Sequence, residues 1–405
     1  MTKTDTATSS ARAGSAWEVL SIFLRLGLTC FGGPIAHIGY FRDEFVVRRK
    51  WLDEQAYADL VALCQFLPGP ASSQTGFSIG LMRAGYGGAL AAWTGFTLPS
   101  AIMLVLFAYG ASALDGPVGT GLVHGLKLVA VAIVAQAVWG MARSLCPDKQ
   151  RASIACVAAL LLLFSTSALA QISAIVLSGI AGLLLCRAEQ NNGAGHITMP
   201  VSRTAGLVAL VVFFVLLAGL PVLAKLAPSS GIALFEAFYR SGALVFGGGH
   251  VVLPLLREAV VAPGWVSGDV FLTGYGAAQA VPGPLFTFAA YLGAVVKGFP
   301  NGIAGAAVAL IGIFLPGILI LLAALPFWDS FRKRLTAQAM MRGVNAAVVG
   351  ILGAALYNPV WTSTVQGPRD FAIALVGFVL LTAWRAPPLV VVAFSAVAGI
   401  GAAML

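Results

Sequence analysis

Two short motifs rich in glycine and proline occur twice in this chain and could bind an anion through backbone N–H groups. Phe-Gly-Gly stands at 31–33 and 246–248, and Gln-x-x-Pro-Gly-Pro stands at 65–70 and 279–284. Prolines on both sides of a glycine should end one helix and start another, because proline lacks an N–H and clashes with the preceding turn. The helix that starts after the break presents free N–H groups and a positive dipole end, which suit an anion.

The two Pro-Gly-Pro copies differ in the side chains that follow them. Pro70 is a favourable first helical residue, and the hydroxyls of Ser72, Ser73 and Thr75 come directly after it. The second copy offers Thr287 among apolar neighbours. We therefore expect two related sites of unequal polarity, and a helix kink held by packing is the alternative.

The glycines of Phe-Gly-Gly permit unwinding and close backbone approach, although close helix packing through small residues would use them equally well. The candidate substrate-binding residues of the two motifs are Phe31, Gly32, Gly33, Gln65, Pro68, Gly69, Pro70, Ser72 and Ser73 in the first copy, and Phe246, Gly247, Gly248, Gln279, Pro282, Gly283 and Pro284 in the second.

Four basic residues lie in otherwise apolar segments and are candidates for a cationic lining. Arg25 and Arg240 occupy matched positions, six residues before each Phe-Gly-Gly, and Lys127 lies between two leucines. Arg342 is the fourth and aligns with His124. A charge at membrane depth costs ~2.5 kcal/mol or more, so it normally faces a cavity or a partner. Anchoring at the membrane interface is the alternative role.

Two acidic residues precede the matched arginines and are candidates for proton coupling. Glu18 lies seven residues before Arg25, and Glu236 lies four before Arg240. Each pair falls on one helix face, so an intrahelical ion pair is the simpler alternative. Two histidines near the glycine-rich breaks are expected to be structural, His37 and His250.

A matched basic-acidic pair follows each Phe-Gly-Gly. The pairs are Arg42-Asp43 and Arg257-Glu258. Residues 41–56 combine aromatic and charged side chains, a pattern typical of an interfacial amphipathic helix. We expect both pairs to be interface anchors, with gate latches as the alternative.

Composition places these elements in a membrane. The chain is 59% hydrophobic and 10% charged, with a mean hydropathy of +0.92, whereas soluble domains carry about 25% charged residues. Several blocks exceed the ~20 apolar residues that span a bilayer. The polar start lacks the layout of a cleaved signal. The net charge of +9 fits loops anchored by Lys and Arg rather than nucleic-acid binding, and five scattered cysteines predict neither a metal site nor a cofactor.

The hydrophobic pattern predicts an all-α multi-pass protein with two six-segment repeats. We expect a polar tail at 1–15, a first repeat at 16–187, a linker with a connecting helix at 188–230, and a second repeat at 231–405. The unmatched segment at about 204–227 would turn the second repeat upside down if each repeat crosses an even number of times. If the Pro-Gly-Pro segments enter and leave on one side, the number of crossings changes.

Phe-Gly-Gly-Pro followed by Gln-x-x-Pro-Gly-Pro, in two copies within about 400 residues, resembles the chromate ion transporter family in its long, two-domain form. The resemblance covers about residues 16–357 by motif. It implies a bacterial inner-membrane protein that exports chromate, driven by the membrane potential or a proton gradient, and confers chromate resistance. This chain departs from the paired pattern at Gly249-His250, which stand where the first copy has Pro34-Ile35.

Other functions remain as alternatives. Chromate is a tetrahedral dianion like sulfate, so a sulfate or other oxyanion transporter and a channel-like anion pore are both compatible with these residues, and sulfate is an expected competitor. An enzyme is not expected, because no dinucleotide fingerprint follows a strand. The expected partners are chromate and the lipid bilayer, and a homodimer is left open.

Overall fold

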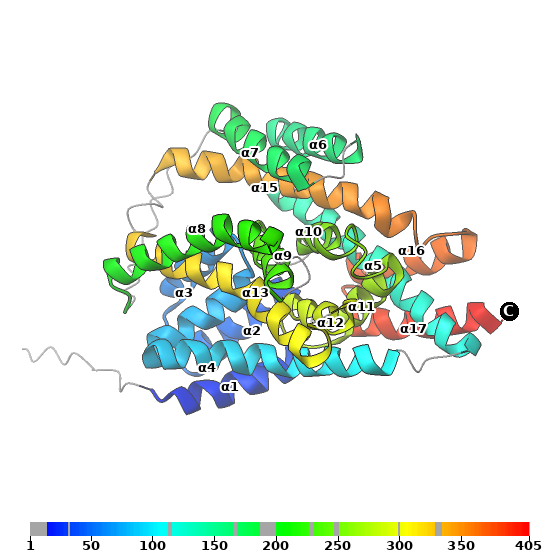
Figure 1. Ribbon diagram of the computed structural model, residues 1–405, viewed down its shortest axis with the longest axis horizontal. Coiled ribbons are helices and arrows are strands. Elements are labelled where there is room, and N and C mark those ends of the chain that lie inside the picture. Colours follow the sequence, from blue (N-terminus) through cyan, green and yellow to red (C-terminus); the bar gives the residue numbers. More distant parts are fainter. Residues whose placement is uncertain are drawn as a thin grey trace, which may run out of the picture.

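The computed structural model describes residues 14–30, 33–111, 116–164, 168–186, 200–226, 231–246, 251–298, 300–328 and 334–404. Within these ranges the chain is helical and contains no strand, so the predicted all-α fold is confirmed (Figure 1). Five helices in the described ranges are long and apolar enough to cross a membrane: Ala71–Gly110, Val118–Leu145, Arg203–Leu226, Gly302–Phe327 and Leu335–Asn358.

The two halves of the chain contain corresponding series of helices on either side of one connecting helix. The first half has α1 (Ala16–Thr29), α2 (Gly33–Arg42), a π-helical turn (Asp43–Arg48), α3 (Glu54–Phe66), α4 (Ala71–Ala111), α5 (Gly116–Leu145), α6 (Lys149–Phe164) and α7 (Ala168–Leu185). The connecting helix is α8 (Arg203–Leu226). The second half has α9 (Gly231–Ala243), α10 (Val252–Val260), α11 (Gly268–Ala280), η3 (Leu285–Thr287), α12 (Phe288–Val295), α13 (Gly302–Ala324), η4 (Leu325–Phe327), α15 (Leu335–Ala355), η5 (Leu356–Trp361), α16 (Pro368–Thr382) and α17 (Pro388–Met404).

Helix α3 and the first part of α4 form a hairpin around the first Pro-Gly-Pro, and their far ends lie close together. Helix α4 is bent at Ala84 and Gly85, where φ is −143° and +62°. Just before the bend, the Arg83 guanidinium lies 4.7 Å from the ring centre of Trp51, which precedes α3. The ends of α3 and of the first part of α4 that lie farthest from Pro-Gly-Pro, here called the outer ends, are therefore neighbours. The second part of α4, after the bend, does not belong to the hairpin.

Helices α1 and α2 also lie side by side rather than forming one continuous helix. Helix α1 ends at Thr29 and α2 begins at Gly33, whose φ is +76°. Phe23 of α1 lies 5.5 Å from Phe41 of α2, ring centre to ring centre. Helices α1 and α2 thus form a second hairpin, and aromatic packing holds them together.

The last two helices of each half pack on the other half. Helices α6 and α7 cover α15, while α16 and α17 cover α5, at the top and right of Figure 1. The contacts use matched residues: a Cβ on Gly343 would meet the carbonyl of Ser178, and one on Gly125 would meet that of Ser395. Small residues let helix backbones approach closely in a membrane. The two halves are therefore interlocked.

Replacement of Gly125 should weaken this interlock. Gly125→Val places a branched side chain against the backbone of α17, and overpacking of this kind costs about 1–3 kcal/mol. Gly140→Val, in the same helix but with nothing within 4 Å of its Cβ position, is the matched control. Thermal unfolding in detergent should show a lower midpoint for Gly125→Val only, and equal midpoints would contradict the close contact.

Candidate anion site

The glycine at each Pro-Gly-Pro tip bonds to the other half of the chain, just before the other half's Phe-Gly-Gly. The Gly69 N–H donates to the Val245 carbonyl at 2.7 Å, and the Gly283 N–H donates to the Cys30 carbonyl at 2.8 Å. Val245 and Cys30 are the residues directly before Phe246 and Phe31. Each Pro-Gly-Pro tip is therefore bonded to the residue that precedes the Phe-Gly-Gly of the other half, and the exchange of equivalent contacts is typical of a two-fold relationship.

Both tips also fit closely against the proline-containing part of a long helix in the other half. A Cβ on Gly69 would lie 2.9 Å from the Cα of Gly317, next to Pro316 of α13. One on Gly283 would lie 2.9 Å from the Oγ of Ser100, next to Pro99 of α4. Their φ angles are +118° and +96°, which side chains rarely adopt. Glycine is required at both tips for conformation and for space.

The first tip carries several buried polar groups. Helix α4 starts at Ala71, so its first N–H groups have no carbonyl acceptor within the helix. The Ser72 hydroxyl lies 3.4 Å from the Nδ1 of His37. The Ser73 hydroxyl and the Nε2 of His37 are buried without a hydrogen-bond partner. Unsatisfied buried groups of this kind are costly, which favours a site that receives a polar ligand.

The second tip is more apolar and more closed. The Thr287 hydroxyl donates to the Pro284 carbonyl at 2.7 Å, and Phe286 and Phe288 are fully buried beside it. The Nε2 of Gln279 is buried without a partner, whereas the matched Gln65 is exposed. The expected inequality of the two copies therefore has a structural basis.

Several predicted motif residues fall outside the described part of the chain. These are Phe31, Gly32, Gly247 and Gly248, together with His250. Their neighbours Gly33 and Phe246 are described, and both are partly buried.

Three of the predicted cations have carboxylate partners. Lys127 of α5 lies 2.6 Å from Asp269 of α11 and is the most buried of the three, with 14% of its side chain exposed. Arg25 pairs with Glu44 at 2.7 Å, and Arg240 pairs with its helix neighbour Glu236 at 3.0 Å. The fourth cation, Arg342, is partly buried and also has an interaction.

The proton-coupling candidates are both engaged in ion pairs. Glu18 pairs with Arg83 at 3.1 Å rather than with Arg25, because Arg83 returns to the start of α1 at the end of the first hairpin. Glu236 forms the intrahelical pair that its spacing predicts.

Glu44 holds three arginines at the outer end of the first hairpins. It accepts from Arg25, Arg48 and Arg49 at 2.7, 3.0 and 2.6 Å while only 7% exposed. Burial acts to raise the pKa of Glu44, but the hydrogen bonds from Arg49 and Arg48 and the charge of Arg25 outweigh it, so its pKa lies below the ordinary value. The carboxylate thus stabilises the fold in its ionised form.

Stability should therefore depend on pH through Glu44. Because the folded-state pKa is depressed, the contribution is complete above the ordinary value of 4.5 and is lost as pH falls through the folded-state pKa. Glu44→Gln should cost about 1–3 kcal/mol at pH 7 and flatten the acid side of the stability curve. Asp43→Asn changes a neighbouring carboxylate that is 76% exposed. It should change neither the stability at pH 7 nor the acid side of the stability curve. Parallel pH profiles for parent and Glu44→Gln would refute the assignment.

Two residues near these elements were not among the predicted site residues. His37 was expected to be structural, yet it lies beside Ser72 with one ring nitrogen unpartnered. Arg257 was expected to be an anchor, yet it lines a pocket. Their proximity to the repeated breaks was the available signal, although a single histidine or arginine carries little information without its neighbours in space.

The chain matches the Chromate transporter family over residues 17–183 and again over 232–400. It is 27% identical to the "Chromate transport protein" of Pseudomonas aeruginosa, over 91% of this chain and 87% of that protein. It is also 27% identical to a "Probable chromate transport protein" of Synechococcus elongatus, over 96% of both. A shorter relative, the "Uncharacterized transporter YwrB" of Bacillus subtilis, is 34% identical over 40% of this chain and 82% of its own length.

No solved structure matches the chain significantly. The two family matches cover most of the sequence, and each contains one Phe-Gly-Gly and one Pro-Gly-Pro motif. The chain therefore belongs to the chromate transporter family.

Proposed function

We propose that this protein exports chromate across the inner membrane of a bacterium, with its anion site where the Pro-Gly-Pro tips meet the Phe-Gly-Gly breaks. The observation that carries the proposal is the reciprocal pair of hydrogen bonds, from Gly69 to Val245 and from Gly283 to Cys30. Relatives that align over most of the chain are named chromate transport proteins. The free N–H groups and serine hydroxyls at the start of α4 are suited to a tetrahedral dianion.

The two halves have opposite orientations in this proposal. The second part of α4 leads from Arg83, beside the outer ends of the first hairpins, to Tyr109, whose hydroxyl is 2.7 Å from the Cβ position of Gly302. Gly302 begins α13. In the second half, α11 and α12 form a hairpin around the second Pro-Gly-Pro, and the Lys297 N–H after α12 donates to the Trp265 carbonyl before α11 at its outer end. The hairpins of the two halves thus open at opposite ends of α4, which supports an inverted repeat.

The membrane potential supplies the driving force for export. Each elementary charge is worth about 2.3 kcal/mol per 100 mV, so an inside-negative potential favours exit of a dianion. Glu18 and Glu236, the candidates for proton coupling, are both ion-paired. Export by potential alone needs no proton-coupling residue and is the simpler mechanism, and chromate resistance is its expected consequence for the cell.

Uptake of labelled chromate into inverted proteoliposomes tests the proposal. We expect saturable uptake that increases with an interior-positive potential and that unlabelled sulfate reduces by competition. Sulfate uptake without chromate uptake would favour a sulfate transporter, and linear, unsaturable flux would favour a channel-like pore. Absence of flux for both anions would overturn the proposal.

A further inference from the structure

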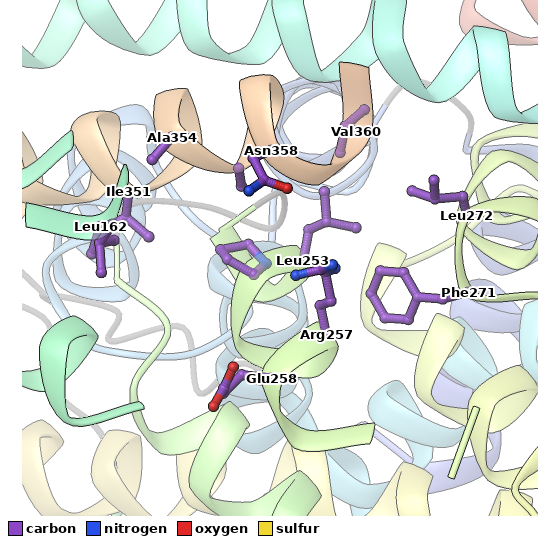
Figure 2. A pocket seen from close by; sticks show the side chains of 12 residues that line it. Leu162, Leu253, Arg257, Glu258, Phe271, Leu272, Ile351, Ala354, Asn358 and Val360 are labelled. Atoms are coloured by element: carbon purple, nitrogen blue, oxygen red, sulfur yellow. The ribbon is translucent and has the colours of Figure 1, made fainter. Parts of the chain in front are cut away.

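A pocket away from the tips lies where the second-half hairpins meet α15 and the end of α6. It has an empty volume of about 510 Å³, part of which is open to solvent. Its polar lining residues are Arg257 and Glu258 of α10 and Asn358 of η5. The remaining walls are apolar, and Figure 2 shows Leu253, Phe271 and Ile351 among them.

Arg257 is the unusual feature of this pocket. Its side chain is partly buried, and it forms no hydrogen bond or ion pair with any described residue. Every other partly buried Lys or Arg side chain in the described ranges has an interaction: Arg49, Arg83, Lys127, Arg151, Arg240 and Arg342. A guanidinium with five donors and no acceptor is costly in an apolar setting. The position is therefore prepared for an anionic ligand.

Asn358 supplies a second donor to the same space. Its backbone leaves helical geometry, with φ −124° and ψ 111°, and its side chain lines the pocket from an exposed position. In Figure 2, Arg257 and Asn358 reach into one hollow from different elements, while the Glu258 carboxylate lies apart from the Arg257 head group. The two side chains attract each other through their charges, but among the described residues no ion pair within 4.0 Å joins them.

We infer that this pocket is a second oxyanion site, in which Arg257 donates a paired hydrogen bond to a tetrahedral dianion and Asn358 donates a third. The planar guanidinium fork matches such oxygens, and the apolar walls lower the local polarity and so strengthen the interaction. The inference rests on the proposed transport of an oxyanion for its biological role. Binding itself does not depend on transport.

The first half provides a matched control for Arg257. Arg42 occupies the equivalent sequence position, but its guanidinium already forms ion pairs with Glu54 at 2.7 Å and with Asp43 at 3.7 Å. Arg42→Gln should therefore leave oxyanion binding unchanged. Arg257→Gln should weaken it about tenfold or more, as expected for loss of a hydrogen bond from a charged group.

The test uses the purified full chain in nanodiscs and titration with radiolabelled sulfate as the probe. We expect Arg257→Gln to bind more weakly, Arg257→Lys to recover part of the affinity, and Glu258→Gln to bind more tightly, because it removes negative charge from the pocket. If Arg257→Gln does not fold, two other variants test the site: Glu258→Gln should bind sulfate more tightly and Asn358→Leu should bind it more weakly than the parent. Unchanged affinity in folded Arg257→Gln, or weaker binding in Glu258→Gln, would overturn the inference.

The same samples separate this inference from the proposed function. A parent protein that binds sulfate through Arg257 but moves no oxyanion into vesicles would refute transport and retain the site. A parent that transports chromate, with Arg257→Gln equal to Arg42→Gln in sulfate binding and in half-saturating chromate concentration, would refute the site and retain transport.

Discussion

Gly69→Ala and Gly283→Ala should each reduce chromate transport about tenfold or more. Both glycines have positive φ angles, where a side chain costs about 1–3 kcal/mol in strain. A Cβ would also approach Gly317 Cα and Ser100 Oγ, respectively, at 2.9 Å. Either change should separate a tip from its hydrogen-bond acceptor in the other half, so the initial rate in proteoliposomes should fall even where the protein is made in normal amounts.

Gly219→Ala is the control for these two variants. Gly219 lies within α8 and has nothing within 4 Å of its Cβ position, so alanine should be neutral there or slightly stabilising. If both tip variants transport at the parent's rate with unchanged thermal stability, the tips do not need the observed geometry, and the proposed anion site would be wrong.

Lys127→Gln should raise the half-saturating chromate concentration, whereas Asp269→Asn should not. Lys127 is largely buried in α5 and Asp269 is 73% exposed, so loss of the carboxylate leaves a cation with low exposure available to the anion. We expect Lys127→Gln to raise the half-saturating concentration severalfold, about 1 kcal/mol, and Asp269→Asn to leave it equal or lower. Concentration-dependent uptake measures both values.

A purely structural ion pair would give a different result. The two variants would then lose thermal stability to a similar extent and show parallel changes in transport, and the exchanged pair Lys127→Asp with Asp269→Lys would recover both properties. That pattern would mean that Lys127 stabilises the packing of α5 on α11 and is not part of the anion path.

The repeated motifs predicted much of this architecture because backbone breaks depend on local residue types. Pro68, Gly69 and Pro70 predict that one helix ends and another begins, and the same holds for the second copy, whereas these residues leave the hairpin itself as one alternative. The unmatched segment at about 204–227 corresponds to α8 to within a few residues.

Contacts between distant segments could not be predicted in the same way. Arg83 lies beside Trp51 and Glu18 because the first part of α4 runs back along α3 and ends at the bend at Gly85. Sequence spacing alone suggested a pair between Glu18 and Arg25. The packing of α7 on α15 depends on small residues such as Gly343, which are common in any membrane helix. The surroundings of Arg257 suggest a function only when the packing of α15 beside α10 is known.

The central claim is that two halves of opposite orientation meet at the tips, and two-sided cysteine labelling tests it most directly. In a chain without its native cysteines, Val47→Cys marks the outer end of the first-half hairpins and Ala262→Cys that of the second-half hairpins; both positions are exposed. Tyr86→Cys, beyond the bend of α4, should react from the same face as Val47→Cys. We predict that a membrane-impermeant thiol reagent labels Val47→Cys and Ala262→Cys from opposite faces of sealed vesicles. Labelling of both from one face would contradict the inverted arrangement.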